Sequence, residues 1–230
     1  GWSELPSPGS GTAIVLAAPA AGNLVAAVFG SNACALELVA DSWQPIGPPL
    51  PVADRVGEPA LAIGSAGHPA LGWIDGNQLR VYRYDAGWTA IAAITLPAAP
   101  AGIDHMSLAM HGTTLAVAYD AWAGSFGVLA AKVTGTQTSW TRLGHLLDLD
   151  PQSDAVGPAI AIDASGAPIV AWTELVDGMR NRGLIARWAG ARWQIVGGTP
   201  WLPDPAAVAT RPALALHAGG APVVGYASAG

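Results

Sequence analysis

The segment Gly157–Trp172 reads GPAIAIDASGAPIVAW, two apolar runs joined by a short turn that contains glycine. Glu58–Trp73 (EPALAIGSAGHPALGW) and Arg211–Tyr226 (RPALALHAGGAPVVGY) have the same length and pattern. More divergent copies occupy residues 12–29 and 106–119. Each copy predicts a β-hairpin, because two apolar strands are bounded by Gly and Pro and joined by a tight turn. The chain is therefore built from an internal repeat.

Further strands follow each hairpin. A third alternating strand is clearest at Leu79–Tyr84 and Leu184–Trp188, and a tryptophan then opens a fourth short strand. Four strands that recur about every 44 to 54 residues are typical of propeller blades rather than of a helical solenoid. We therefore predict an all-β chain, a five-bladed β-propeller of four-stranded antiparallel blades. The strand-opening tryptophans, which we expect to pack between blades, are Trp2, Trp43, Trp88, Trp140 and Trp193.

The repeats fill the chain, which predicts a single β-propeller domain over residues 1–230 with repeats at about 12–47, 58–92, 105–144, 157–197 and 211–230 plus 1–8. Trp2 opens an outermost strand without preceding strands, and the last repeat stops soon after its second strand. We expect the N-terminal strand to join the C-terminal blade, because closure removes free sheet edges. The C-terminal blade would still lack a third strand. Either this strand is absent, or residues beyond 230 or another chain supply it. A fragmentary chain is the favoured interpretation.

Composition and charge narrow the range of partners. Hydrophobic residues make up 51% of the chain and charged residues 11%, which indicates a folded protein. The net charge of -6, with Lys132 as the single lysine, argues against nucleic acid or an anionic membrane as a partner. Every apolar run is too short for a membrane helix, so we expect no membrane insertion. Cys34, the single cysteine, excludes an internal disulfide.

Motifs for catalysis or cofactor binding are missing from the sequence. It has no Ser-His-Asp nucleophile motif, no Gly-rich phosphate loop and no metal-ligand spacing of histidines. Asp148–Asp154 gathers carboxylates but lacks the pattern of an EF-hand, so a solvated acidic loop is preferred to a calcium site. We therefore predict no cofactor, no bound metal and no catalytic residue.

Aromatic and acidic residues follow the second strand of several repeats. A sugar ring stacks on an aromatic face while a carboxylate accepts hydrogen bonds from its hydroxyls, so this combination favours a neutral sugar, and an arginine would add a grip on an acidic one. The connections between the second and third strands are longer at residues 120–127 and 173–183. We therefore predict the ligand site on the face of the propeller that carries these connections. The alternative is that the periodic aromatics form core between blades. The candidate ligand-binding residues are Trp73, Asp75, Tyr119, Asp120, Trp122, Trp172, Glu174 and Arg180.

The run at residues 158–174, PAIAIDASGAPIVAWTE, resembles the short blades of secreted bacterial β-propellers related to sialidase-like repeats. Such blades are also similar to those of propeller lectins, including the Photorhabdus type, and the count of five is similar to tachylectin. The resemblance implies a propeller fold, a glycan ligand and an extracellular or cell-surface location. The sialidase Asp-box, Ser-x-Asp-x-Gly-x-x-Trp, is absent, so sialidase activity is not expected.

The leading hypothesis for function is a lectin-like, carbohydrate-binding propeller with weak sites repeated on one face. The alternative is a non-catalytic interaction or structural domain of a larger secreted protein, with another protein as partner and a possible homo-oligomer or partner strand. A glycoside hydrolase, with carboxylates drawn from Asp75, Asp120, Glu174 and the region near Asp104 and His105, is less favoured, because nothing in the sequence fixes the separation that such chemistry requires.

Overall fold

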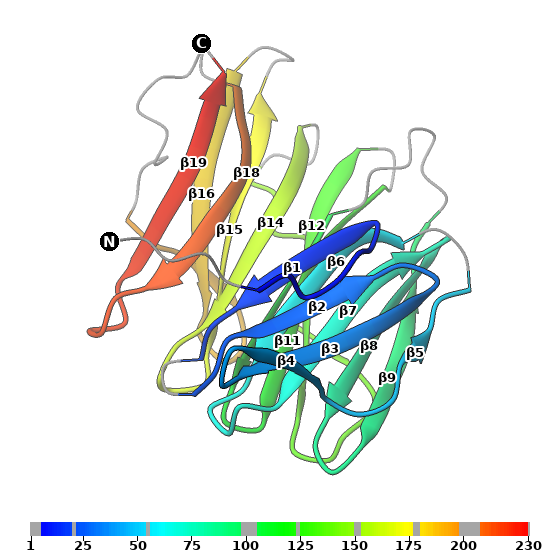
Figure 1. Cartoon of the computed structure of the whole chain (residues 1–230). Helices are drawn as coiled ribbons and strands as arrows, with labels where there is room; N and C mark the ends of the chain where they lie inside the picture. The colour runs from blue at the N-terminus through cyan, green and yellow to red at the C-terminus, as the bar shows by residue number, and fades with distance from the viewer. Residues whose placement is uncertain are drawn as a thin grey trace. The chain divides into compact units, whose positions relative to one another are not determined.

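The computed structural model describes residues 6–19, 22–53, 56–97, 105–122, 125–149, 153–176, 180–197 and 208–229 (Figure 1). Regular structure in these ranges consists of β-strands, without a helix. Accordingly, the described ranges include no helix with the length and apolar character needed to cross a bilayer.

The strands form five antiparallel sheets, which we number as blades 1 to 5 in chain order (Figure 1). In blades 1 to 4 each strand pairs with the next one along the chain, and β5 pairs with β3. Blade 1 holds β1 (Ala13–Ala17), β2 (Val25–Phe29), β3 (Asn32–Val39), β4 (Ser42–Pro45) and β5 (Leu50–Pro51), and blade 2 holds β6 (Val56–Ile63), β7 (Pro69–Asp75), β8 (Gln78–Tyr84) and β9 (Trp88–Thr95). Blade 3 holds β10 (Met106–His111), β11 (Thr114–Trp122), β12 (Phe126–Thr134) and β13 (Thr141–Arg142), and blade 4 holds β14 (Asp154–Ile162), β15 (Pro168–Val176), β16 (Arg180–Trp188) and β17 (Trp193–Ile195). Blade 5 holds β18 (Val208–Leu216) and β19 (Pro222–Ala229).

These sheets confirm the predicted four-stranded antiparallel blades, with a partial fifth blade of two strands in the described part of the chain. Trp2 and its neighbours in residues 1–5 lie outside the described residues. The closure of blade 5 by the N-terminal strand, and the supply of its missing strand, therefore stay predictions.

The first strands of three blades share a bulge at the same repeat position. The register of β6 with β7 shifts between Gly57 and Ala60, and β14 and β18 shift at the corresponding places. The residue before the proline has a positive φ in each case, even where it is not glycine: 45° at Glu58, 64° at Gly157 and 42° at Arg211. Proline cannot donate to the ladder, so it sits in the bulge, and the preceding residue takes the left-handed turn.

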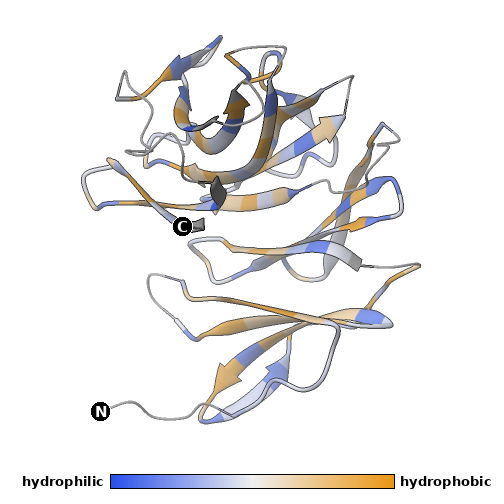
Figure 2. Ribbon diagram, turned by 90° about the horizontal axis from the view of Figure 1, so that it is seen from above, coloured by the Kyte–Doolittle hydropathy of each residue, from blue (hydrophilic) through white to orange (hydrophobic). Residues whose placement is uncertain are grey.

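The blades fall into two compact units, Gly1–Thr95 and Leu96–Gly230. In the first unit, Phe29 and Leu71 pack in one apolar cluster with the fully buried ring of Trp73. In the second unit, a larger cluster joins blade 3 to blade 4 through Leu143, Val170 and Trp172. Small and large apolar side chains interdigitate where two blades pack together. Figure 2 shows apolar residues along the strands.

The fourth-strand tryptophans bind main chain outside their own blade. Trp88 Nε1 donates to the carbonyl of Pro48, which lies between β4 and β5 of blade 1, at 3.0 Å. Trp193 Nε1 donates to Leu143 O, next to β13 of blade 3, at 2.7 Å. Trp43 Nε1 makes the corresponding bond to Pro6 O at 2.8 Å. The predicted packing of these tryptophans between blades is therefore confirmed for Trp88 and Trp193.

The long connections that the sequence placed at residues 120–127 and 173–183 are largely strand. Trp122 pairs with Phe126, and Val176 pairs with Arg180, so both hairpins extend almost to their tips. The expectation of long loops was wrong here, because cross-strand pairs continue past the core aromatic residues and satisfy the backbone groups of these segments.

Candidate functional site

The carboxylate of Glu174 is completely buried and accepts four hydrogen bonds. Its Oε1 accepts bonds from Leu149 N at 2.6 Å and from Trp172 Nε1 at 3.2 Å. Its Oε2 accepts from Nε of Arg182 at 2.8 Å and also from Nη2 of the same guanidinium. Glu174 and Arg182 are directly opposed on β15 and β16, which places the two charges together. A buried charge with this many donors is a structural anchor.

Two more carboxylates are paired with arginines of their own blade. Asp75 Oδ2 accepts from Arg80 Nε at 2.8 Å, with the aspartate side chain 4% exposed. Asp163 binds Arg187 across blade 4, with Nε to Oδ2 at 2.7 Å. Burial opposes ionisation of Asp163, but hydrogen bonds from the Ser165 hydroxyl, backbone N–H groups and Arg187 outweigh it and lower its pKa to about 2. These bonds hold the turn between β14 and β15.

Asp120 joins blade 3 to blade 4. Its Oδ2 accepts from His105 Nδ1 at 2.7 Å and from Gly157 N, in the bulge of β14, at 2.9 Å. Its Oδ1 accepts from the backbone N–H of His105. Asp120 is 0% exposed, and the side chain of His105 is 17% exposed. The Asp120 carboxylate therefore holds the residue before β10 and the bulge of β14, the first strands of blades 3 and 4.

The three carboxylates that the sequence treated as equivalent lie on different faces of their strands. Asp75 and Glu174 stand two residues after Trp73 and Trp172, whereas Asp120 directly follows Tyr119. Successive side chains of a strand point to opposite faces, so Asp120 cannot repeat the role of the other two. The hypothesis of a repeated carboxylate site is corrected accordingly.

The periodic aromatics of blades 1 to 4 are core, whereas Tyr226 of blade 5 is 37% exposed in the described part of the chain. Trp73 and Trp172 are 0% exposed and Tyr119 is 7% exposed. Trp73 stacks on Tyr82 with centroids 5.3 Å apart and meets Phe29 edge-on. The predicted stacking of a sugar on Trp73, Tyr119 or Trp172 is therefore wrong for this structure, because all three side chains are buried. The alternative, a repeating core, is what the structure contains.

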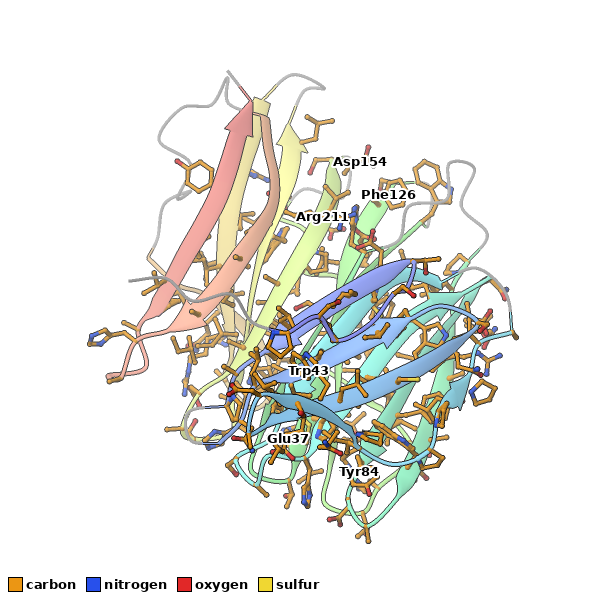
Figure 3. The ribbon with its side chains drawn as sticks, in the orientation of Figure 1. Glu37, Trp43, Tyr84, Phe126, Asp154 and Arg211 are labelled. Atoms are coloured by element: carbon orange, nitrogen blue, oxygen red, sulfur yellow. The ribbon has the colours of Figure 1, made fainter. Side chains whose placement is uncertain are left out.

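Trp122 is the remaining predicted aromatic, and it is partly exposed, with its ring edge-on to Phe126 at 5.1 Å. The side chain of Arg180 lies outside the described residues. Of the acidic run, Asp154 accepts a bond from Phe126 N at 2.8 Å; both residues lie toward the same end of the second unit in Figure 3. Asp148 accepts from Val128 N at 3.1 Å. The residues described in the structure contain no cluster of three or more metal-ligating side chains.

A cavity of about 320 Å³ lies between blades 3 and 4. Blade 3 contributes Lys132 from β12 and Arg142 from β13, and blade 4 contributes Trp188 at the end of β16. The β14–β15 turn, with Ser165 and Gly166, forms another part of the wall. The cavity is thus at the opposite strand ends from the β11–β12 and β15–β16 connections, where the sequence had placed the ligand site.

Gly144 fixes the aromatic side of this cavity. It has φ of +72°, and a Cβ there would lie 3.2 Å from Cζ3 of Trp188. The glycine therefore lets the Trp188 ring pack against the backbone of blade 3. Trp193 meets Trp188 edge-on at 5.3 Å and is itself held by its bond to Leu143 O. The half-buried Trp188 ring is consequently held in place in the wall of the cavity that Lys132 also lines.

Neither a family model nor a curated protein matches this chain. Solved structures do match its fold. A Penicillium chrysogenum α-L-arabinanase complexed with arabinobiose has a TM-score of 0.57 and 12% identity, over 92% of this chain and 74% of that one. An ulvan lyase has a TM-score of 0.56 and 13% identity, over 87% of this chain and 60% of its own. A variant of the Aleuria aurantia lectin, in complex with Fucα1-6GlcNAc, has a TM-score of 0.50 and 12% identity, over 94% and 77%.

The chain has a β-propeller fold. At these identities the similarity shows the fold alone. The chain spans about 60% of the length of the lyase and about three quarters of the arabinanase and the lectin.

Sequence reasoning missed the cavity because its walls come from positions far apart in the chain. Lys132, Arg142 and Trp188 show no common motif. One signal was present: Lys132 is the single lysine, and Arg142 follows one of the strand-opening tryptophans within the same repeat. In the antiparallel register of β12 and β13, Lys132 pairs with Thr141, and both residues line the cavity on the side of blade 3 that meets blade 4.

Proposed function

We propose that this chain is a carbohydrate-binding propeller and that it holds its glycan in the cavity between blades 3 and 4. The observation that carries the proposal is the half-buried ring of Trp188 in a concave site that Lys132 also lines. An aromatic face takes the apolar side of a sugar ring, and nearby donors bind its oxygens. The cavity volume, about 320 Å³, is at the small end of ligand sites and suits one or two sugar units.

Solved structures with a similar fold support a carbohydrate as the class of ligand. Two of the solved structures named above hold a saccharide, arabinobiose in the arabinanase and Fucα1-6GlcNAc in the lectin. An extracellular or cell-surface location, and the closer resemblance to Photorhabdus-type lectins or tachylectin, belong to the same proposal.

Binding of the labelled chain to a broad glycan array tests the proposal, followed by titration calorimetry with the best ligand. Trp188→Ala should abolish binding, because it removes the stacking surface. Tyr84→Ala is the matched control: Tyr84 ends β8 of blade 2, meets Trp88 edge-on at 5.1 Å and covers Gly47 as Trp188 covers Gly144. Both variants remove a comparable packed ring, so both need circular dichroism to show that they are folded.

Selective binding that survives Tyr84→Ala and is lost in folded Trp188→Ala supports the proposal. A blank array from folded wild-type chain overturns it and favours the interaction-domain hypothesis. Binding that is unchanged in Trp188→Ala also overturns the assignment of the cavity. Cleavage of a bound polysaccharide would instead indicate an enzyme.

A further inference from the structure

We propose that the junction of blades 1 and 2 holds a second site, which binds a glycan that carries a free amino group. The site stands at the place in the repeat that corresponds to the cavity between blades 3 and 4, but a carboxylate replaces its lysine. This inference rests on the proposed function for the carbohydrate class of its ligand, and it uses a separate set of residues.

The strand register shows that Glu37 corresponds to Lys132. Glu37 pairs with Gln44, and Lys132 pairs with Thr141. In each case the partner directly follows the tryptophan that opens the fourth strand. Glu37 also shares a strand face with Ala35, which belongs to the apolar cluster that joins blade 1 to blade 2. The glutamate therefore faces blade 2, as the lysine faces blade 4.

Tyr84 corresponds to Trp188 by the same test. Tyr84 pairs with Trp88 on β9, as Trp188 pairs with Trp193 on β17. The tyrosine ring covers Gly47 in blade 1 in the way that the tryptophan ring covers a glycine of blade 3. Trp188 and the lysine of blade 3 line one cavity. The corresponding tyrosine and glutamate therefore border the same space at the junction of blades 1 and 2.

Three rings in different planes stand at this site. Tyr84 meets Trp88 at 70° with centroids 5.1 Å apart, and it meets His68 at 88° with centroids 6.4 Å apart. His68 takes the place of Ala167, which lines the cavity in blade 4. Figure 3 shows Glu37 toward the same end of the first unit as Tyr84. Rings at such angles suit the apolar side of a sugar and the charge of an ammonium group.

The charge of this site is negative. Glu37 Oε1 accepts a hydrogen bond from Asn23 Nδ2 at 3.0 Å, and the carboxylate forms no ion pair with a residue that the structure describes. Asp85 lies 3.2 Å from His68 Nδ1 and is 83% exposed. The second oxygen of Glu37 is therefore available to a ligand.

The arginines of the first unit do not neutralise this carboxylate. Arg80 is bound to Asp75. Arg83 directly precedes Tyr84 on β8, so its side chain points to the opposite face of the blade. These are the arginines that the structure describes in this unit. The chain as a whole carries a net charge of -6, which attracts a cationic ligand at long range.

An amino sugar satisfies both parts of the site. Its ammonium group donates a charge-assisted hydrogen bond to the Glu37 carboxylate, while its apolar side packs on the Tyr84 ring. Lys132 has the opposite charge, so the cavity between blades 3 and 4 should reject this ligand. Neutral glycans, which test that cavity, lack the ammonium group, so Tyr84→Ala remains the control for the cavity.

The test is titration calorimetry with a glucosamine oligomer and with its N-acetylated form, at a mildly acidic pH where the amino groups are protonated. We expect the free amine to bind at least ~10-fold more tightly and to lose most of this advantage at high salt. Glu37→Gln keeps an oxygen for Asn23 and should remove most of the advantage. Tyr84→Ala should abolish it, whereas Tyr84→Phe keeps the ring and should retain it.

Asp41→Asn is the matched control for charge, because Asp41 is an exposed carboxylate in the turn between β3 and β4. It should change the affinity by less than ~2-fold. Circular dichroism must show that each variant is folded.

Equal binding of the two oligomers, or full affinity in Glu37→Gln, overturns this inference and leaves neutral-glycan binding intact. Binding of the glucosamine oligomer that depends on Trp188 instead of Tyr84 also overturns it. Failure of neutral glycans alone overturns the assignment of the cavity and leaves the second site standing. Failure of every glycan overturns both.

Discussion

The carboxylate of Asp120 on β11 accepts a hydrogen bond from the backbone N–H of Gly157 on β14, at 2.9 Å, so a side chain of blade 3 holds the first strand of blade 4. The same carboxylate binds the backbone and ring of His105 on its own blade. Asp120 is 0% exposed, so water cannot replace a lost bond. This carboxylate is a junction between blades, and the hydrolase hypothesis loses one of its candidate groups.

Replacing Asp120 should strongly destabilise the chain. Asp120→Ala leaves buried donors of His105 and Gly157 without an acceptor, and we expect a loss of about 3 kcal/mol or more in the free energy of unfolding. Urea denaturation measures it. Asp85→Ala, which removes a carboxylate that is 83% exposed, should stay within about 0.5 kcal/mol. A loss below about 1 kcal/mol at Asp120 would contradict the assigned role.

The blades were predictable and the site was not, for physical reasons. Alternation and turn glycines act within about ten residues, so segments such as Gly157–Trp172 specify their own hairpin. Trp73 is buried because it meets Phe29, which lies in another blade. Asp120 stands one residue after its aromatic neighbour Tyr119, whereas Asp75 stands two residues after Trp73, so Asp120 lies on the other face of its strand. The cavity depends on the meeting of β13 with the β14–β15 turn, which no local pattern encodes.

The Glu174–Arg182 pair should show strong coupling in a double-mutant cycle. Glu174→Gln leaves Arg182 without its counter-charge and should cost about 3 kcal/mol. Arg182→Met alone leaves a buried carboxylate and should cost a similar amount. The double variant should lose less than the sum of the two by at least about 1 kcal/mol, because neither charge is then left alone. Simple additivity in urea denaturation would show that the pair is not energetically coupled.

Gly47 should tolerate no side chain, for two separable reasons. It has φ of +70°, and an added Cβ would lie 2.6 Å from Cε2 of Tyr84. Gly67 has φ of +80° with open space around it, so Gly67→Ala reports the backbone cost alone, about 1 kcal/mol. Gly47→Ala should cost clearly more, about 2 kcal/mol or above, because Tyr84 must also move. Equal losses of stability in thermal unfolding would show that the ring yields freely.

Removing the negative charge of Asp148 should raise the stability of the folded chain at pH 7. Burial raises its pKa, the bond from Val128 N partly lowers it, and the nearby charge of Glu174 raises it again. The ionised form is therefore penalised in the folded state, and this penalty is felt at pH 7 and vanishes in acid, below both pKa values. Asp148→Asn keeps an oxygen for Val128 and should raise stability on the order of 0.5 kcal/mol at pH 7 but not at pH 3. A loss at pH 7 would contradict this sign.

Asp163 should show the opposite dependence on pH. Its pKa falls from 3.8 in the unfolded reference to about 2 in the folded chain, because bonds from Ser165, Ala167 N and Arg187 outweigh the effect of burial. The ionised carboxylate thus contributes stability that is fully present above about pH 4 and is lost as the pH falls toward 2. We expect Asp163→Asn to lower the free energy of unfolding by about 1 to 2 kcal/mol at pH 7, after allowance for solvent near the pair. Urea denaturation of both proteins across this range should show the two curves converging in acid, whereas a constant gap down to pH 2 would mean that packing of the turn, and not its charge, is what the substitution removes.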